Sequence, residues 1–199
     1  MLKLILASAS PRRIELLNQI GLEFDIMPAN ICEDSEGFLE AGKYAMEMSR
    51  KKAVSVAERI RHEASRETVV LGADTVVGID DQLLGKPSDP DDAKRMLKLL
   101  ENRWHEVTTG ITLVRAGDME AITESEVTRV KVSPFPEGFL ERYLASKEPF
   151  GKAGSYAIQG LGSLMVERIE GCYFNVMGLP LFRLSRMLDR LGHKVLSWN

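Results

Sequence analysis

The segment from Ser8 to Arg13 reads Ser-Ala-Ser-Pro-Arg-Arg and places two arginines at the expected start of a helix. Ser10 followed by Pro11 is typical of an N-cap with proline at the first helical position. Two arginines at the positive end of a helix dipole cost about 0.3–1 kcal/mol each unless an anion is bound. A helix N-terminus is also a common phosphate site, to which arginine adds bidentate contacts. The pattern favours an anion site with Arg12 and Arg13, and the alternative is that both pair with surface acids.

Asp74 is a second candidate, because it is the only charged residue in the apolar run from Val69 to Val77. A carboxylate in a buried strand costs several kcal/mol unless it is paired, hydrogen-bonded or bound to a metal. Asp74 is therefore a candidate general base or Mg²⁺ ligand. The alternative is an aspartate at a strand end that caps a nearby loop, and this segment alone favours neither.

Three further charged residues give weaker signals when each is taken alone. Lys52 ends a run of basic residues on an expected helix, Lys86 lies in a Gly-Lys-Pro turn, and Glu33 lies in an acidic loop. Each of these patterns is more often a solvated surface than a functional site.

A glycine-rich segment from Gly151 to Gly162 is expected to form a flexible loop that leads into a strand. It contains Gln159, whose amide both donates and accepts hydrogen bonds, as recognition of a base edge requires. The segment is not a Walker A phosphate loop, because alanine follows Lys152, and it is not a dinucleotide fingerprint, because Met165 replaces the third glycine. A nucleophile elbow is absent and the histidines are scattered, so a serine-hydrolase triad has little support.

Hydrophobic periodicity predicts the elements that would position these residues. Strands are predicted over residues 2–7, 68–79, 105–115 and 122–132, with two short strands within 151–178 and one at the C-terminal end. Helices are predicted over residues 11–20, 41–64, 88–100, 136–146 and 180–191. The two strands at 105–132 are expected to form a hairpin, whereas other strands are joined through helices. This mixture of connections favours an α/β or α+β fold with a mixed sheet.

Composition limits the class of protein. A chain of 199 residues with 44% apolar residues can bury a sizeable core. Its net charge of -3 argues against a protein built around nucleic acid. Cys32 and Cys172 lie in no zinc-ligand spacing, and no apolar run reaches the roughly 20 residues that span a bilayer. We expect a cytoplasmic protein with neither a nucleic-acid nor a membrane partner.

Six segments in order resemble the Maf family of nucleoside triphosphate pyrophosphatases, also called septum formation inhibitors. These segments are residues 6–13, 72–77, 84–87, 109–110, 151–160 and 175–180. The resemblance implies a single domain over residues 1–199, with an elongated, two-lobed α/β fold related to inosine triphosphate pyrophosphatases. A central mixed sheet flanked by helices and a nucleotide cleft between the lobes are part of this expectation. The resemblance also implies hydrolysis between the α and β phosphates with a divalent metal, Mg²⁺ or Mn²⁺, and allows a homodimer.

The resemblance implies roles for particular residues. The catalytic residues would be Asp74, as proton acceptor, with Lys52 and Lys86. The substrate-binding residues would be Ser8, Arg12, Arg13, Thr75 and Gln159, and the metal ligands would be Glu33 and Asp74. Thr75 beside Asp74, together with Arg12 and Gln159, resembles the branch of the family that acts on dTTP and UTP. One departure is Asn102, in an expected turn, where many members have glycine.

Two alternative functions would use the same cleft. A non-catalytic nucleotide-binding regulator of septum formation would keep the basic residues but would not need an isolated carboxylate such as Asp74 beside the phosphates. A pyrophosphatase for modified or non-canonical nucleotides would share the chemistry and differ in the base. Whether Asp74 accepts a proton or binds the metal stays open, because both roles need a carboxylate beside the phosphates.

Overall fold

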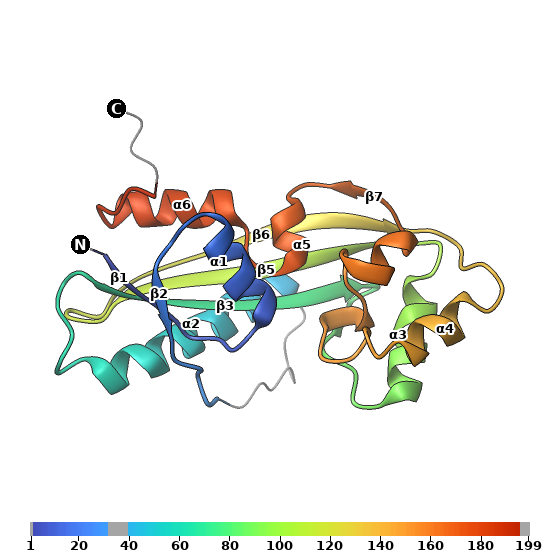
Figure 1. Cartoon of the computed structure of the whole chain (residues 1–199), viewed down its shortest axis with the longest axis horizontal. Helices are drawn as coiled ribbons and strands as arrows, with labels where there is room; N and C mark the ends of the chain where they lie inside the picture. The colour runs from blue at the N-terminus through green and yellow to red at the C-terminus, as the bar shows by residue number, and fades with distance from the viewer. Residues whose placement is uncertain (1, 32–39, 196–199) are drawn as a thin grey trace.

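A seven-stranded mixed sheet runs through the computed structural model, which describes residues 2–31 and 40–195 (Figure 1). The strands are β1 (Lys3–Leu6), β2 (Phe24–Ile26), β3 (Thr68–Ile79), β4 (Gln82–Leu84), β5 (Trp104–Arg115), β6 (Glu120–Val132) and β7 (Val166–Glu170). The helices are α1 (Pro11–Gln19), α2 (Ala41–Ile60), α3 (Pro90–Leu100), α4 (Phe139–Ala145), α5 (Tyr173–Met177) and α6 (Leu181–Arg190). The strand order is β2-β1-β3-β5-β6-β7, and β4 pairs with β3. The predicted mixed α/β fold with a central mixed sheet flanked by helices is confirmed.

The predicted elements that differ from the structure do so for local reasons. The helix predicted over 41–64 ends at Ile60, and residues 61–63 form a turn. Only one of the two strands predicted within 151–178 is present, as β7. The rest of that stretch forms two 3₁₀ turns and α5. The 3₁₀ turns replace the other strand, because Gly151, Gly154 and Gly160 adopt positive φ angles that interrupt an extended chain. Residues 192–195 are not a strand, and the remainder of the predicted C-terminal strand lies outside the described residues.

Asn102 lies in the turn that follows α3 and adopts a φ of 57°. This left-handed conformation suits glycine, and asparagine tolerates it better than most other residues. The Lys131 ammonium donates to the backbone carbonyl of Asn102 at 2.7 Å. The asparagine therefore keeps a turn of the kind that glycine would form.

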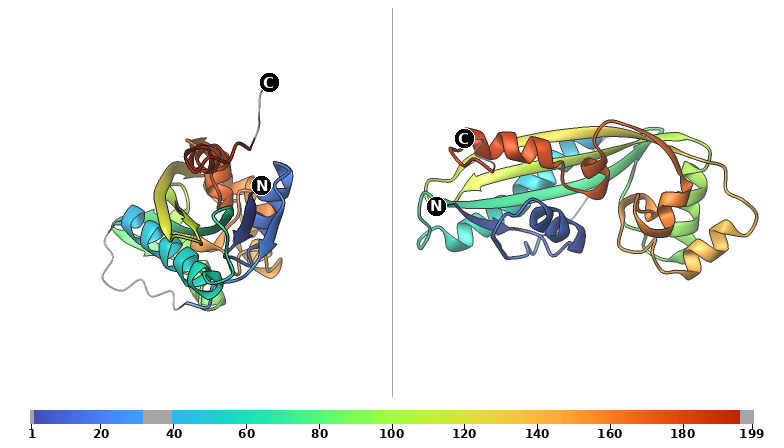
Figure 2. Two further views of the ribbon diagram at one scale, coloured as in Figure 1. Left: turned by 90° about the vertical axis from the view of Figure 1, so that its left-hand side faces the viewer. Right: turned by 45° about the horizontal axis from the view of Figure 1, so that its top comes forward.

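Strands β3, β5 and β6 run along the long axis, and two groups of elements lie against their two ends (Figures 1 and 2). One group contains β1, β2, α1, α2 and α6, and the other contains α3, α4 and the 3₁₀ turns. One edge of β3 changes its partner, because β1 pairs with residues 68–71 and β4 pairs with residues 77–79. Within the described chain no strand pairs with residues 72–76 on that edge. This segment contains Asp74 and lies where the two groups meet.

Helix α2 packs directly on β3 and β5, because glycines replace side chains at two points of contact. A Cβ atom on Gly72 would lie 2.2 Å from the carbonyl oxygen of Ser49, and one on Gly110 would lie 2.2 Å from that of Ala45. Gly110 is the partner of Asp74 in the register of β3 and β5. The contact therefore holds α2 over the strand segment that carries Asp74.

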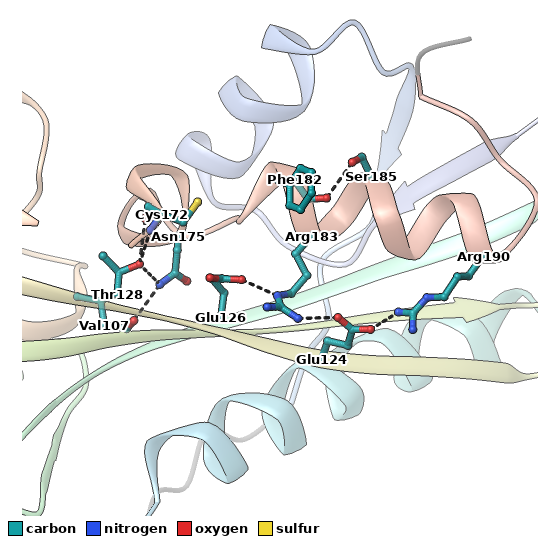
Figure 3. Close-up of polar contacts among 10 residues, drawn as sticks. All are labelled: Val107, Glu124, Glu126, Thr128, Cys172, Asn175, Phe182, Arg183, Ser185 and Arg190. Atoms are coloured by element: carbon teal, nitrogen blue, oxygen red, sulfur yellow. Dashed lines mark hydrogen bonds and ion pairs between the residues drawn. The ribbon is translucent and has the colours of Figure 1, made fainter. Parts of the chain in front are cut away.

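The opposite face of the sheet carries the larger hydrophobic core, which α1, α5 and α6 help to cover. Helix α6 is also tied to β6 by ion pairs (Figure 3). Arg183 Nε lies 2.6 Å from Glu126, its Nη1 lies 2.7 Å from Glu124, and Arg190 contacts Glu124 as well. These pairs are partly exposed, so each contributes at most about 1 kcal/mol. No helix in the described ranges combines the length and apolar character that crossing a membrane requires.

The glycine-rich segment is anchored to the sheet through Tyr156. Its hydroxyl lies 2.7 Å from His105 Nε2, and the two rings meet edge to face. His105 is buried, and this burial lowers its pKa to about 4. The imidazole is therefore neutral at pH 7, and its contact with Tyr156 is a hydrogen bond between neutral groups.

Gly110→Ala is expected to destabilise the protein by about 1–3 kcal/mol or more, because the added methyl group would overlap the α2 backbone. Gly42→Ala, in the first turn of α2, is the matched control. A Cβ atom there would meet only Ser125 Oγ at 4.0 Å, and alanine is favoured over glycine in a helix by about 0.5–1 kcal/mol. Urea unfolding measures both changes. Equal stability of the two variants would contradict the close contact between α2 and β5.

The free energy of unfolding is expected to fall as the pH drops from about 6.5 toward 4, because only the unfolded chain protonates His105 in this range. The folded pKa lies below the unfolded one, so the contribution is complete above pH 6.5 and is lost on acidification. Its full size is about 3 kcal/mol for a shift of about 2.5 pKa units. His105→Gln should flatten this pH dependence in urea unfolding. An unchanged slope would exclude His105 as its source.

Candidate active site

A cavity of about 660 Å³ lies beside the unpaired segment of β3. One wall comes from residues 7–13 and from α2, and the opposite wall comes from residues 85–86, 150–153, 156 and 158. The strand residues 74–77 and 107, residues 28–29 after β2, and the end of α5 at 176–178 complete the lining. Ligand pockets for small molecules span about 300–1,000 Å³, so the cavity has the size of a small-molecule site.

The described lining of this cavity carries five cationic side chains and one carboxylate. The cations are Arg12, Arg13, Lys52, Lys86 and Lys152, and the carboxylate is Asp74. The chain as a whole is acidic, with a net charge of -3. A concentration of positive charge in a concave site attracts anions, and it fits a triphosphate with about four negative charges.

Lys52 and Asp74 form a buried ion pair at the surface of this cavity. Lys52 Nζ lies 2.6 Å from Asp74 Oδ1, and each side chain is 10% exposed. The pair supplies the partner that a carboxylate in an apolar strand requires, so Asp74 is not merely a loop cap. Removing Lys52 would leave the buried Asp74 carboxylate without this ion pair, a loss that costs about 3–5 kcal/mol in proteins.

Arg13 is buried and joins three parts of the cavity wall. Its Nε donates to the Gly178 carbonyl at 3.0 Å, its Nη1 to Ser8 Oγ at 3.1 Å, and its Nη2 to Thr75 Oγ1 at 3.2 Å. These bonds connect the turn before α1, strand β3 and the end of α5. Arg13 therefore positions neighbouring site residues, in addition to contributing charge.

Arg12, the adjacent residue, has a different environment. Burial lowers its pKa, and the neighbouring Tyr143 and Tyr156 act in the opposite direction. In the described part of the chain no carboxylate forms an ion pair with Arg12. The alternative explanation of the two arginines was that both pair with surface acids. The structure does not show such a pair for Arg12 among the described residues.

The end of α5 forms one side of the cavity and is held by Asn175 (Figure 3). Asn175 is fully buried, and its Nδ2 donates to the Val107 carbonyl and to Thr128 Oγ1, both at 2.9 Å. These bonds fix α5 on β5 and β6. They therefore also fix the Gly178 carbonyl that accepts the hydrogen bond from Arg13.

The structure brings together most of the residues that the sequence singled out. Ser8, Thr75 and Lys86 line the cavity with the charged residues described above. Gln159 is half-buried and does not line it, although the preceding residue, Ile158, does. Glu33 lies outside the described residues.

The lining residues that the sequence did not single out include Tyr44, Lys152 and Tyr156. Lys152 was considered only as part of a Walker A motif that the sequence does not contain. The sequence feature that could have identified Lys152 is its position between glycines, in the segment that also contains Gln159. Tyr44 and Tyr156 gave no separate signal, because aromatic residues are common in cores.

Among the described residues, Asp74 is the one carboxylate that lines the cavity, and it pairs with Lys52. In the described residues no three His, Cys, Asp or Glu side chains cluster in a way that could hold a metal ion. Mg²⁺ usually binds through one or two carboxylates, substrate phosphates and water. Asp74 is therefore the described lining carboxylate that a cation bound through phosphate oxygens would contact.

Comparison with known proteins agrees with this site. A family model described as Maf-like protein matches residues 3–191. The chain is 48% identical over 199 residues to a dTTP/UTP pyrophosphatase of Acetivibrio thermocellus, with 99% of each chain covered. It is 45% identical over 197 residues to a dTTP/UTP pyrophosphatase of Caldicellulosiruptor bescii, which covers 99% of this chain and 98% of the relative. These matches include all six segments of the resemblance, and the chain belongs to the Maf-like protein family.

Proposed function

We propose that this chain is a nucleoside triphosphate pyrophosphatase that hydrolyses dTTP and UTP to the monophosphate and pyrophosphate. The observation that carries the proposal is the Lys52–Asp74 pair, a buried carboxylate at the surface of a cavity rich in cations. The names of the two relatives above support the choice of dTTP and UTP. We expect the reaction to take place in the cytoplasm, where nucleoside triphosphates are present.

In the proposed reaction a water molecule attacks the α-phosphorus of the bound nucleotide. The bond between this phosphorus and the oxygen that bridges to the β-phosphorus breaks, and pyrophosphate leaves with the bonding electrons. Asp74 accepts the proton that the attacking water loses. Lys52 holds the carboxylate at Oδ1 and offsets its charge, so that Asp74 repels the phosphates less.

The cationic side chains stabilise the charge that develops on the leaving oxygen. Arg12 and Lys86 lie on opposite walls of the cavity, so a phosphate chain between them contacts both. Such preorganised charges act mainly on the transition state, because they need no rearrangement when the negative charge moves.

A divalent cation, Mg²⁺ or Mn²⁺, fits beside Asp74, with Glu33 as the expected second carboxylate. When bound, such a cation neutralises phosphate charge and lowers the pKa of a coordinated water. The Asp74 carboxylate would act either as a metal ligand or as the proton acceptor. A variant that lacks this carboxylate loses both functions.

The preference for a pyrimidine base is proposed for Thr75 and Gln159. Thr75 Oγ1 lies 2.9 Å from Thr109 Oγ1 and accepts a hydrogen bond from Arg13, so its side chain is fixed in the cavity wall. Gln159 follows the lining residue Ile158, and we therefore expect the base at this end of the cavity.

Release of pyrophosphate from a panel of nucleoside triphosphates tests the proposed function. With Mg²⁺ or Mn²⁺ present, dTTP and UTP should yield pyrophosphate and a monophosphate, and purine nucleotides should yield little of either. Faster turnover of purine or modified nucleotides would overturn the roles of Thr75 and Gln159. If every nucleotide bound without turnover, the regulator of septum formation would replace the enzyme as the better account.

Asp74→Asn is expected to lower the rate of pyrophosphate release from dTTP by about 10²–10⁴-fold, because the amide cannot accept the proton. Nucleotide binding should stay largely intact, since the amide has nearly the same shape. Asp81→Asn, an exposed aspartate in the β3–β4 turn, is the control and should turn over normally. Near-normal turnover by Asp74→Asn would remove Asp74 from the mechanism.

A further inference from the structure

Lys152 lines the cavity, and the proposed reaction assigns it no separate role. It lies between Gly151 and Gly154, whose φ angles of 75° and 67° favour glycine. The N–H of Gly154 donates to the Gly85 carbonyl at 3.0 Å, which holds this segment beside the turn that contains Lys86. The backbone geometry therefore places Lys152 in the cavity wall, on the side opposite α2.

The ammonium group of Lys152 is held by a neutral acceptor. It donates to the backbone carbonyl of Glu148. The Glu148 carboxylate instead accepts from the Leu161 N–H at 3.0 Å, the Gly162 N–H at 2.8 Å and the Tyr143 hydroxyl at 3.1 Å. No ion pair within 4.0 Å joins Lys152 to a carboxylate in the described residues. Because an ammonium group has three donors, the Glu148 carbonyl leaves donors for a ligand.

Arg12 is the positive charge that acts on Lys152 within the cavity. Burial lowers the pKa of Lys152, Arg12 lowers it further, and Glu148 acts in the opposite direction. Two partly buried like charges, one from α1 and one from the glycine-rich segment, raise the free energy of the folded protein. An anion that contacts both removes this repulsion.

We propose that Lys152 and Arg12 together form a phosphate-binding subsite that links α1 to the glycine-rich segment. Its ligand is a polyphosphate chain, and in the enzyme this is the triphosphate of the nucleotide. The inference rests on the proposed function, to which it adds Lys152 as a residue in contact with substrate. It also makes the bound phosphates a bridge between the two groups of elements.

The test is binding of inorganic tripolyphosphate to the whole protein, measured by calorimetry without a divalent metal. Lys152→Gln is expected to weaken binding by about 10-fold or more, the usual size of a lost charged hydrogen bond. Lys152→Arg keeps the charge and should bind within about threefold of the unmodified protein. Lys94→Gln, an exposed lysine on α3, is the matched control and should bind normally.

Two results would overturn the subsite. One is tripolyphosphate binding by Lys152→Gln within about twofold of the unmodified protein. The other is an equal loss in Lys152→Arg and Lys152→Gln, which would mean that the loop and not the charge matters. If Lys152→Gln fails to fold, Lys152→Met takes its place, because methionine keeps most of the apolar stem.

Kinetics separate this inference from the proposed function. With dTTP, Lys152→Gln should raise KM and leave kcat nearly unchanged, as expected for a contact of similar strength in ground and transition states. An unchanged KM would contradict the subsite while the enzyme itself stands. Tripolyphosphate binding that depends on Lys152, without any pyrophosphate release from nucleotides, would support the subsite and contradict the proposed reaction.

Discussion

The contact between α2 and the sheet determines where the central charged pair of the cavity lies. Gly72 and Gly110 present no side chains to α2, so its backbone rests directly on β3 and β5. At this separation Lys52 reaches Asp74 with a distance of 2.6 Å. A helix held farther away would leave the carboxylate buried in an apolar strand without its partner. The close packing of α2 on these glycines is therefore required for the ion pair between Lys52 and Asp74.

The cavity exists because one edge of β3 is shared between two partners. Pairing with β1 ends at Leu71 and pairing with β4 begins at Val77, so the strand between them borders the cavity. The cations reach this opening from separate segments of the chain, and Arg13 connects several of these segments through backbone and hydroxyl oxygens. Such a site depends on long-range packing, which explains why no single sequence motif describes it.

The sequence predicted the parts of the site that carry a local signal. Asp74 stood out as a lone charge in an apolar strand, and the arginines stood out at a helix start that favours anions. Lys52 was hidden in a basic run, because only the packing of α2 shows which lysine faces the strand. Lys152 was missed, because its place in the cavity wall depends on the positive φ angles of nearby glycines, which the sequence does not show. The same glycines explain why 3₁₀ turns replace one of the strands predicted within 151–178.

The central claim is that a triphosphate binds between the first turn of α1 and the glycine-rich segment, with its α-phosphorus beside Asp74. A crystal structure with α,β-imido-dUTP, whose bridging nitrogen resists hydrolysis, tests this most directly. The account predicts phosphate oxygens in contact with Arg12 and Lys152, and the α-phosphorus next to the Asp74 carboxylate. A nucleotide bound elsewhere, such as in the second concave surface between Glu40 and Arg129, would contradict it.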